Sequence, residues 1–121
     1  MSQPTDHFQL EWHGEALVII PAGNIESLNW EYVEQAAELV LVPLRRKEVP
    51  LAVFDLERAP YFGSVFLALL LRSYKLVKLK GGEMVLCNVG RLGRDLLSTT
   101  CLDTLWAVYE TREQALEAIG A

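Results

Sequence analysis

The amino-acid sequence predicts an α/β fold in which helices cover a mostly parallel β-sheet. Three observations support this class: short apolar runs alternate with amphipathic stretches, a glycine-containing turn joins the first two runs, and no repeat or linker interrupts the pattern. The expected order is β-β-α-β-α-β-α-β-α, with right-handed crossovers between parallel strands. The chain has 121 residues, the size of one ordinary domain, so we expect residues 1–121 to form a single domain.

The N-terminal part of the chain predicts a β-hairpin followed by a helix. Residues 8–12 alternate between apolar and polar, residues 16–20 are a compact apolar run, and the short connection contains glycine. The first strand is therefore expected to be an antiparallel edge strand. The helix begins after Asn29, a good N-cap, and Pro43 either kinks it or ends it near Val42.

The rest of the chain alternates strands with helices. Ser64 opens the most hydrophobic helix, whose first two turns are apolar on all sides, and two glycines end it. Thr111 is expected to cap a short amphipathic helix at the C-terminal end. The remaining strands are expected at residues 51–54, 83–87 and 105–109, and the third helix at residues 91–98.

Composition and charge exclude several classes of protein. With 51% hydrophobic and 22% charged residues, the chain has enough apolar material for a core, which argues against disorder. The net charge of -5 disfavours non-specific binding to nucleic acid or anionic lipid. We expect the two short basic clusters to be solvated faces, with no direct nucleic-acid partner. These clusters are Arg45, Arg46 and Lys47, and Lys75, Lys78 and Lys80.

The sequence predicts a cytoplasmic protein without membrane insertion. The first residues do not read as a signal peptide, and the longest apolar run, residues 65–71, is much shorter than the roughly 20 residues that cross a bilayer. Cys87 and Cys101 both lie in apolar sequence, too far apart for a CxxC motif, and are interpreted as structural thiols. The histidines, His7 and His13, are interpreted as solvated residues near the hairpin rather than metal ligands.

A search for catalytic motifs finds none, so we expect a protein that is not an enzyme and needs no cofactor or metal. A GxGxxG loop, a P-loop, an HExxH motif and a GxSxG elbow are all absent from the sequence. Ser64 is the one residue that stands out, because it opens the most apolar helix. Two interpretations stay open: a plain helix cap, or a phosphorylation site favoured by the positive end of the helix dipole.

The order of elements and several segments resemble the STAS domains, specifically the anti-sigma factor antagonists. VFDLERAPYFGSVFLALLLR is similar to a family segment in which a strand ending in Asp-Leu leads to a phosphorylatable Ser or Thr, with Arg eight residues later. Those positions here are Asp55-Leu56, Ser64 and Arg72. GGEMVLCNV, the turn at residues 96–102, TREQALEAI and the early loop at residues 23–26 are also similar to family segments.

The resemblance implies a cytoplasmic regulator of transcription that acts in signal transduction through protein-protein interaction. Its partner would be an anti-sigma factor that is also a serine kinase, and phosphorylation of Ser64 would disrupt their complex. The kinase would supply the ATP. The partner-binding surface is expected to comprise Glu26, Tyr61, Phe62, Gly63, Ser64 and Val65. Exposed aromatic side chains at Tyr61 and Phe62 would suit a binding hot spot, whereas Phe62 could equally pack beneath the loop.

Two alternatives remain open at the level of sequence. The family's phosphosite usually reads Asp-Ser-Ser/Thr-Gly, whereas this chain reads Phe62-Gly63-Ser64-Val65. This departure favours a STAS docking or scaffold subunit of a larger signalling or transport assembly that is not phosphorylated. The other alternative is a small-ligand-binding α/β protein, because open parallel sheets bind ligands at the carboxyl ends of their strands. The sequence leaves the homo-oligomeric state open.

Overall fold

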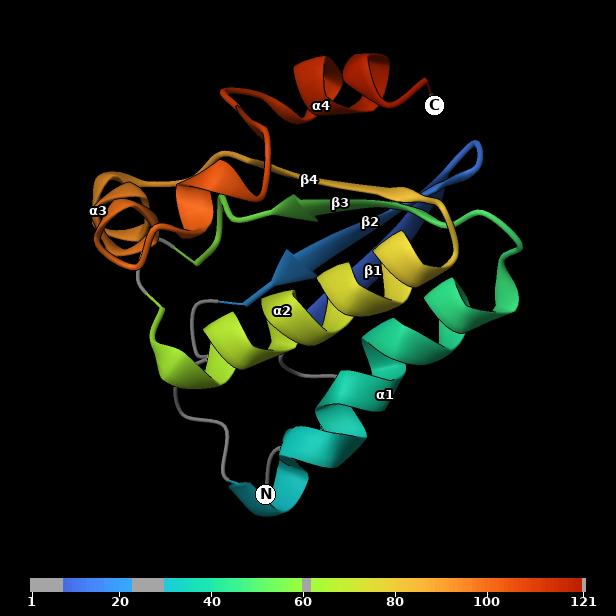
Figure 1. Ribbon diagram of the computed structural model, residues 1–121, viewed down its shortest axis with the longest axis horizontal. Coiled ribbons are helices and arrows are strands. Elements are labelled where there is room, and N and C mark those ends of the chain that lie inside the picture. The colour runs from blue at the N-terminus through green and yellow to red at the C-terminus, as the bar shows by residue number, and fades with distance from the viewer. Residues whose placement is uncertain (1–7, 23–29, 60–61, 121) are drawn as a thin grey trace.

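The computed structural model describes residues 8–22, 30–59 and 62–120, and in these residues five strands form one mixed sheet (Figure 1). The strands lie in sequence order, with β1 antiparallel to β2 and every later neighbour parallel. The α/β class, the order of elements and the antiparallel edge strand are therefore confirmed. The strands are β1 (Phe8–His13), β2 (Ala16–Pro21), β3 (Leu51–Asp55), β4 (Glu83–Cys87) and β5 (Val108–Tyr109).

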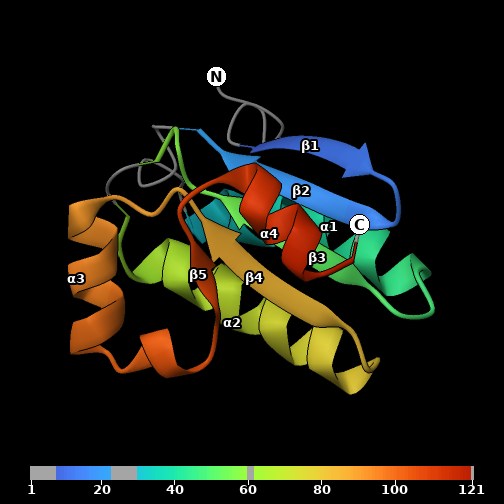
Figure 2. The same ribbon diagram turned by 90° about the horizontal axis from the view of Figure 1, so that it is seen from above.

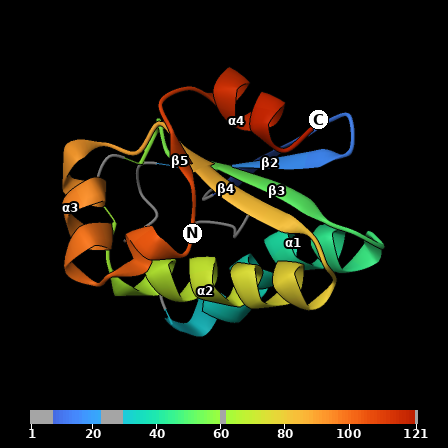
Figure 3. The same ribbon diagram turned by 45° about the horizontal axis from the view of Figure 1, so that its top comes forward.

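The helices cover the sheet unequally. Because the parallel strands advance in one direction and crossovers are right-handed, the connecting helices α1 (Trp30–Arg46) and α2 (Ser64–Leu79) fall on the same face. The third helix, α3 (Arg91–Thr99), lies at the carboxyl end of the parallel strands, and α4 (Arg112–Ala118) crosses the opposite face (Figures 2 and 3). Both faces are covered, as a mostly parallel sheet requires.

Alternation along β3 divides the core between the two faces. Phe54 points toward α1 and α2 and belongs to the larger apolar cluster, together with Phe66 of α2. Val53 belongs to the smaller cluster beneath α4, and Asp55 lies on the same side of the strand because side chains alternate. The buried carboxylate of Asp55 thus lies at the carboxyl end of a central strand, on the face of the sheet that is covered only by the short helix α4.

The first helix continues through Pro43 and ends at Arg46. The expectation that it might stop near Val42 is therefore wrong. Val40, Leu41 and Leu44 on either side of the proline are buried in the larger cluster, and this packing outweighs the loss of one backbone hydrogen bond. The predicted N-cap, Asn29, lies outside the described residues.

The segment before β5 differs from the prediction. A strand was expected at residues 105–109, but only Val108–Tyr109 pairs with β4, and a 3₁₀ turn at Leu102–Thr104 precedes it. Trp106 explains the difference, because its ring is buried and meets Tyr74 edge-on with centroids 5.8 Å apart. The chain turns inward there to bury the indole, so pairing with β4 begins only afterwards.

The two cysteines have different environments. Cys87 is buried at the end of β4, as expected. Cys101 is exposed in a left-handed turn with φ of 62°, so the expectation that both thiols are buried structural residues is wrong for it.

In the described part of the chain, no helix combines the length and apolar character needed to cross a bilayer.

Candidate functional site

Ser64 is the first helical residue of α2 and is exposed. The sequence suggested that its hydroxyl could cap the helix, but Gly63 occupies the N-cap position and no side chain makes the capping hydrogen bond. The backbone carbonyl of Gly63 accepts the first helical hydrogen bond from Leu67 N at 3.0 Å. The Ser64 hydroxyl is therefore not used as the helix cap, and it lies at the positive end of a 16-residue helix.

Phe62 lies inside the protein. Its side chain is 3% exposed and meets Phe66 edge-on, with ring centroids 5.2 Å apart. Its ring also lies against α3, where a Cβ on Gly93 would approach within 2.8 Å of Phe62 Cε1. Of the two interpretations left open for Phe62, packing beneath the loop is therefore confirmed and an exposed aromatic contact is wrong, because the ring gains more by filling the space between α2 and α3.

The remaining predicted contact residues are only partly described. Val65 is half-buried and packs against the larger core cluster, while Gly63 is intermediate in exposure. Ala68 lies one turn after Ser64 on the same side of α2 and is also exposed. Glu26 and Tyr61 lie outside the described residues. The described surface at the start of α2 is thus a narrow strip with a hydroxyl and small apolar groups.

A polar network that the sequence did not reveal lies on the α4 face. The Asp55 carboxylate is 1% exposed, and Arg112 Nε donates to its Oδ2 at 2.7 Å. Its other oxygen, Oδ1, accepts from Asn88 Nδ2 at 2.9 Å and from the backbone N–H of Glu57 at 3.1 Å. These three donors compensate the burial of the charge and tie together β3, the start of the β3–α2 loop, β4 and α4.

The network continues across the sheet to β1. Arg112 Nη1 lies 3.3 Å from Glu11 Oε1, and His13 Nε2 lies 3.0 Å from the same oxygen. The hydrogen bond from His13, followed by the charge of Arg112, lowers the pKa of Glu11. His13 therefore has a structural partner, consistent with its interpretation as a residue of the hairpin surface. His7 lies outside the described residues.

One signal in the sequence points to this network. Arg112 is the first helical residue of α4, where the helix dipole disfavours a positive charge. A cation at that position indicates a carboxylate partner elsewhere. The sequence does not identify Asp55 as that partner, because the two residues are 57 positions apart and meet only through the fold.

A shallow pocket of about 340 Å³ lies beside this network at the carboxyl ends of the strands. Its charged groups are mostly carboxylates, and its arginine is already bound to Asp55. The described residues contain no group of three or more His, Cys, Asp or Glu side chains arranged to hold a metal ion. The pocket is lined by Asp55, Glu57, Asn88, Thr111, Arg112 and Glu113.

Fold and sequence together place the protein in a known family. A family model for the STAS domain matches residues 7–115. The chain therefore belongs to the STAS domain family, and the resemblance seen in the sequence is confirmed. A curated relative, an anti-sigma F factor antagonist from Paenibacillus polymyxa, is 25% identical over 108 residues, which cover 89% of this chain and 90% of that protein.

Solved structures share the architecture. An anti-sigma-factor antagonist (STAS) domain protein from Planctomyces limnophilus superposes with a TM-score of 0.82 and 29% identity, covering 94% of this chain and 98% of that one. The Bacillus cell fate determinant SpoIIAA in its phosphorylated form superposes with a TM-score of 0.72 and 25% identity, covering 93% and 98%. This chain is thus similar to anti-sigma factor antagonists along almost its whole length.

Proposed function

We propose that this protein is a regulatory docking module that binds an anti-sigma factor through the start of α2, with Ser64 as the residue that controls binding. The observation that carries the proposal is the exposed hydroxyl of Ser64 at the first turn of the most apolar helix of the chain. Anti-sigma factor antagonists are named for the protein they oppose, and the similar SpoIIAA has been solved in a phosphorylated form. The first fact supports a protein partner, and the second supports control by phosphorylation.

The position of Ser64 determines how a phosphate would act. A phosphate at the start of a helix is favoured by the backbone N–H groups and the dipole, so it would not unfold α2. It would instead add nearly two negative charges to a surface strip formed with Val65 and Ala68. A partner that packs on this strip would have to desolvate those charges, and the complex would weaken.

The kinase activity in this scheme belongs to the partner. An anti-sigma factor that is also a serine kinase would bring its own ATP, transfer the terminal phosphoryl group to Ser64 Oγ and keep the ADP. The hydroxyl proton passes to a base in the kinase. The antagonist supplies only the accepting hydroxyl and the docking surface, so the scheme requires no cofactor in this chain.

A second candidate function is a docking subunit that is never phosphorylated. Phe62 favours this alternative, because it stands where the family usually has an acidic residue and its side chain is buried in the core. If that acid helps the kinase to select or activate the serine, this chain lacks the group. Docking would then depend on the shape of the strip alone.

Recovery of the tagged protein from its own cells separates the two candidates. Mass spectrometry would identify proteins that co-purify and would measure phosphate on the Ser64 peptide. A kinase-like partner together with partial phosphate on Ser64 supports the switch. A stable partner with Ser64 unmodified under every growth condition supports constitutive docking, and a chain recovered without any protein partner contradicts both.

Substitutions test the same point with the purified partner. We expect Ser64→Asp to weaken binding at least about tenfold, or about 1.4 kcal/mol, and Ser64→Ala to bind as the wild type does. Ser98→Asp, which adds the same charge at an exposed serine of α3, is the matched control and should leave binding unchanged. Equal binding by Ser64→Asp and the wild type would contradict the switch.

A further inference from the structure

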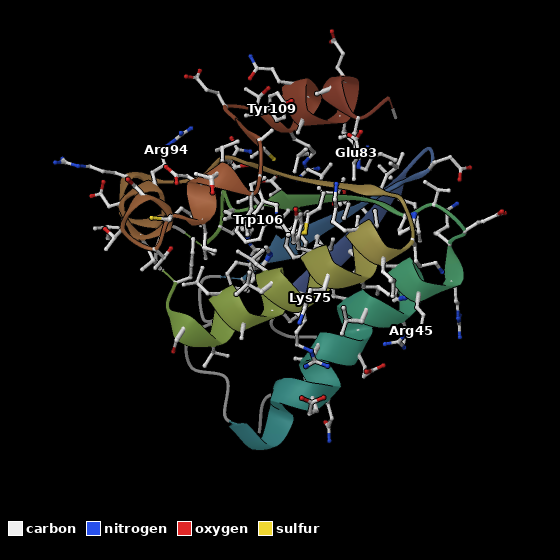
Figure 4. The ribbon with its side chains drawn as sticks, viewed as in Figure 1. Arg45, Lys75, Glu83, Arg94, Trp106 and Tyr109 are labelled. Atoms are coloured by element: carbon white, nitrogen blue, oxygen red, sulfur yellow. The ribbon has the colours of Figure 1, made fainter. Side chains whose placement is uncertain are left out.

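Folding gathers cations at the end of the molecule opposite Ser64. The C-terminal ends of α1 and α2, the β1–β2 turn and the starts of β3 and β4 lie at this end (Figure 1). The 16 residues of α2 place it about 24 Å from Ser64 along the helix axis. Five of the chain's eleven Lys and Arg residues lie here and form what we call the basic end: Arg45, Arg46, Lys47, Lys78 and Lys80. Lys75 lies one turn before the end of α2, nearer the middle of the molecule (Figure 4).

Contacts join the two basic clusters of the sequence into one surface. Lys80, just after α2, donates through Nζ to the backbone carbonyl of Arg45 at the end of α1. Lys47 lies over the ring of Trp12 in β1, with Nζ 5.4 Å from the ring centroid. The sequence predicted two separate solvated faces, whereas the structure brings their residues, Lys75 excepted, to one end of the molecule. Figure 4 shows Arg45 at this end and Arg94 of α3 at the other.

The basic end has a local positive surplus on a chain with net charge -5. Four carboxylates accompany its five cations, and two of them form ion pairs: Glu38 with Arg45 at 3.4 Å, and Glu15 with Lys47. The other two are Glu48 and Glu83. Among the described side chains, Arg46 and Lys78 at the basic end, and Lys75 one turn earlier on α2, form no ion pair. These three charges are therefore available to an external anion.

Exposed apolar side chains accompany these charges. Leu79 is 85% exposed, Val49 53% and Trp12 51%, and all three lie at the basic end. Cations near the C-termini of helices compensate the helix dipole, which by itself would account for Arg45, Arg46 and Lys78. The dipole does not account for a leucine, a valine and a tryptophan left in water beside them.

We propose that the basic end is a peripheral membrane-binding surface that adsorbs to anionic phospholipid headgroups. Lysine and arginine bind such headgroups, while tryptophan and short aliphatic side chains enter the boundary between headgroups and acyl chains. The aliphatic groups favour a lipid surface over nucleic acid, because phosphate and base contacts are polar and leave Leu79 in water. Helix ends and turns protrude here, a shape that suits a flat, deformable surface.

This inference does not depend on the proposed function. The start of α2, where Ser64 lies, points away from the basic end, so a bound membrane would leave the candidate docking strip open (Figure 1). Lipid binding and partner binding are thus separate events that can be measured separately. If both occur, the module brings its protein partner to the membrane.

Vesicle co-sedimentation tests the proposal with matched variants. The purified chain is mixed with phosphatidylcholine vesicles with and without phosphatidylglycerol, and the bound fraction is measured as salt increases. We expect binding only to the anionic vesicles, falling with salt. Removing the three free cations in Arg46→Gln/Lys75→Gln/Lys78→Gln should weaken binding on the order of 100-fold, at about 1 kcal/mol per cation near the surface.

The control variant removes three exposed cations from the other end of the sheet. Arg58→Gln/Arg91→Gln/Arg94→Gln gives the same net charge and should bind nearly as the wild type does. Leu79→Ser should also weaken binding, in a way that does not depend on salt. The proposal is overturned if the wild type does not bind anionic vesicles, if both triple variants lose binding equally, or if the basic end binds duplex DNA and not vesicles.

Discussion

On one face of the sheet the covering helices α1 and α2 have 17 and 16 residues, whereas α4 on the other face has seven. The first face is closed by apolar packing, centred on Phe54 and Phe66. The second has a smaller apolar cluster beneath α4, and its margin is closed by the ion pair between Arg112 and Asp55. A short helix cannot bury much apolar surface, so a directional polar bond complements it.

The two faces are closed by different interactions, so the stability of each responds differently to the substitution of a single residue. Apolar packing is spread over many contacts, and its loss scales with the volume removed. A buried ion pair is different, because removal of one partner leaves the other charged and poorly solvated. We therefore expect the first face to contribute most of the stability and the second to determine whether α4 stays docked.

The largest effect is expected from Phe66→Ala on the first face. Phe66 is 1% exposed and packs against the rings of both Phe54 and Phe62. Its truncation leaves a cavity between the two remaining rings, and we expect a loss of about 3–5 kcal/mol in the free energy of unfolding, measured by urea titration. Ile119→Ala in the cluster beneath α4 is the counterpart and should cost less, about 2 kcal/mol. Equal losses would contradict the unequal division of the core.

The next effect is expected from Arg112→Leu on the second face. The substitution leaves the Asp55 carboxylate buried with two of its three donors, Asn88 and the Glu57 amide. We expect a loss of about 3 kcal/mol in the free energy of unfolding, measured by urea titration. Arg94→Leu, at an exposed arginine of α3, is the matched control and should change stability by less than about 0.5 kcal/mol. A loss below about 1 kcal/mol for Arg112→Leu would show that the ion pair is dispensable.

The same contrast explains what the sequence predicted. The periodicity of apolar residues and the length of apolar runs are properties of short segments of sequence. The strands β1 to β4, the helices and the Thr111 cap were therefore predicted within a few residues. The cap is formed as expected, with Gln114 N donating to Thr111 Oγ1 at 3.1 Å. The position of Ser64 at the start of α2 was also predicted, because an apolar helix after a glycine has a clear beginning.

What the sequence could not predict depends on residues that meet through the fold. Phe62 is buried because α3 passes close to it, at Gly93. Asp55 meets Arg112, and Arg45 meets Lys80, only after the sheet brings distant segments together. The strand predicted at residues 105–109 was too long for the same reason, because Trp106 turns inward to meet the ring of Tyr74 on α2. Pairing across the fold leaves no periodic signal in one chain.

The smallest and most local effect is expected in the alkylation rates of the two thiols. These rates report whether α4 stays docked, and they can be measured while the protein remains folded. Cys87 is buried in the cluster beneath α4, and burial, together with the charge of Asp55, raises its pKa to about 12. The thiolate is the reactive form of cysteine. Near neutral pH, iodoacetamide should therefore alkylate exposed Cys101 quickly, and should alkylate Cys87 only when α4 moves away from the sheet. Mass spectrometry of the two peptides measures both rates in one sample.

Arg112→Leu sharpens this measurement because it weakens the attachment of α4 on the second face. We expect it to accelerate Cys87 alkylation about tenfold for every 1.4 kcal/mol lost from α4 docking, while the Cys101 rate stays constant as an internal control. Phe66→Ala should accelerate Cys87 only by as much as it promotes global unfolding. Equal alkylation of both thiols in the native wild type would mean that α4 does not protect Cys87. A Cys87 rate unchanged by Arg112→Leu would mean that α4 is held by its apolar contacts alone. The two faces would then be closed by the same kind of interaction.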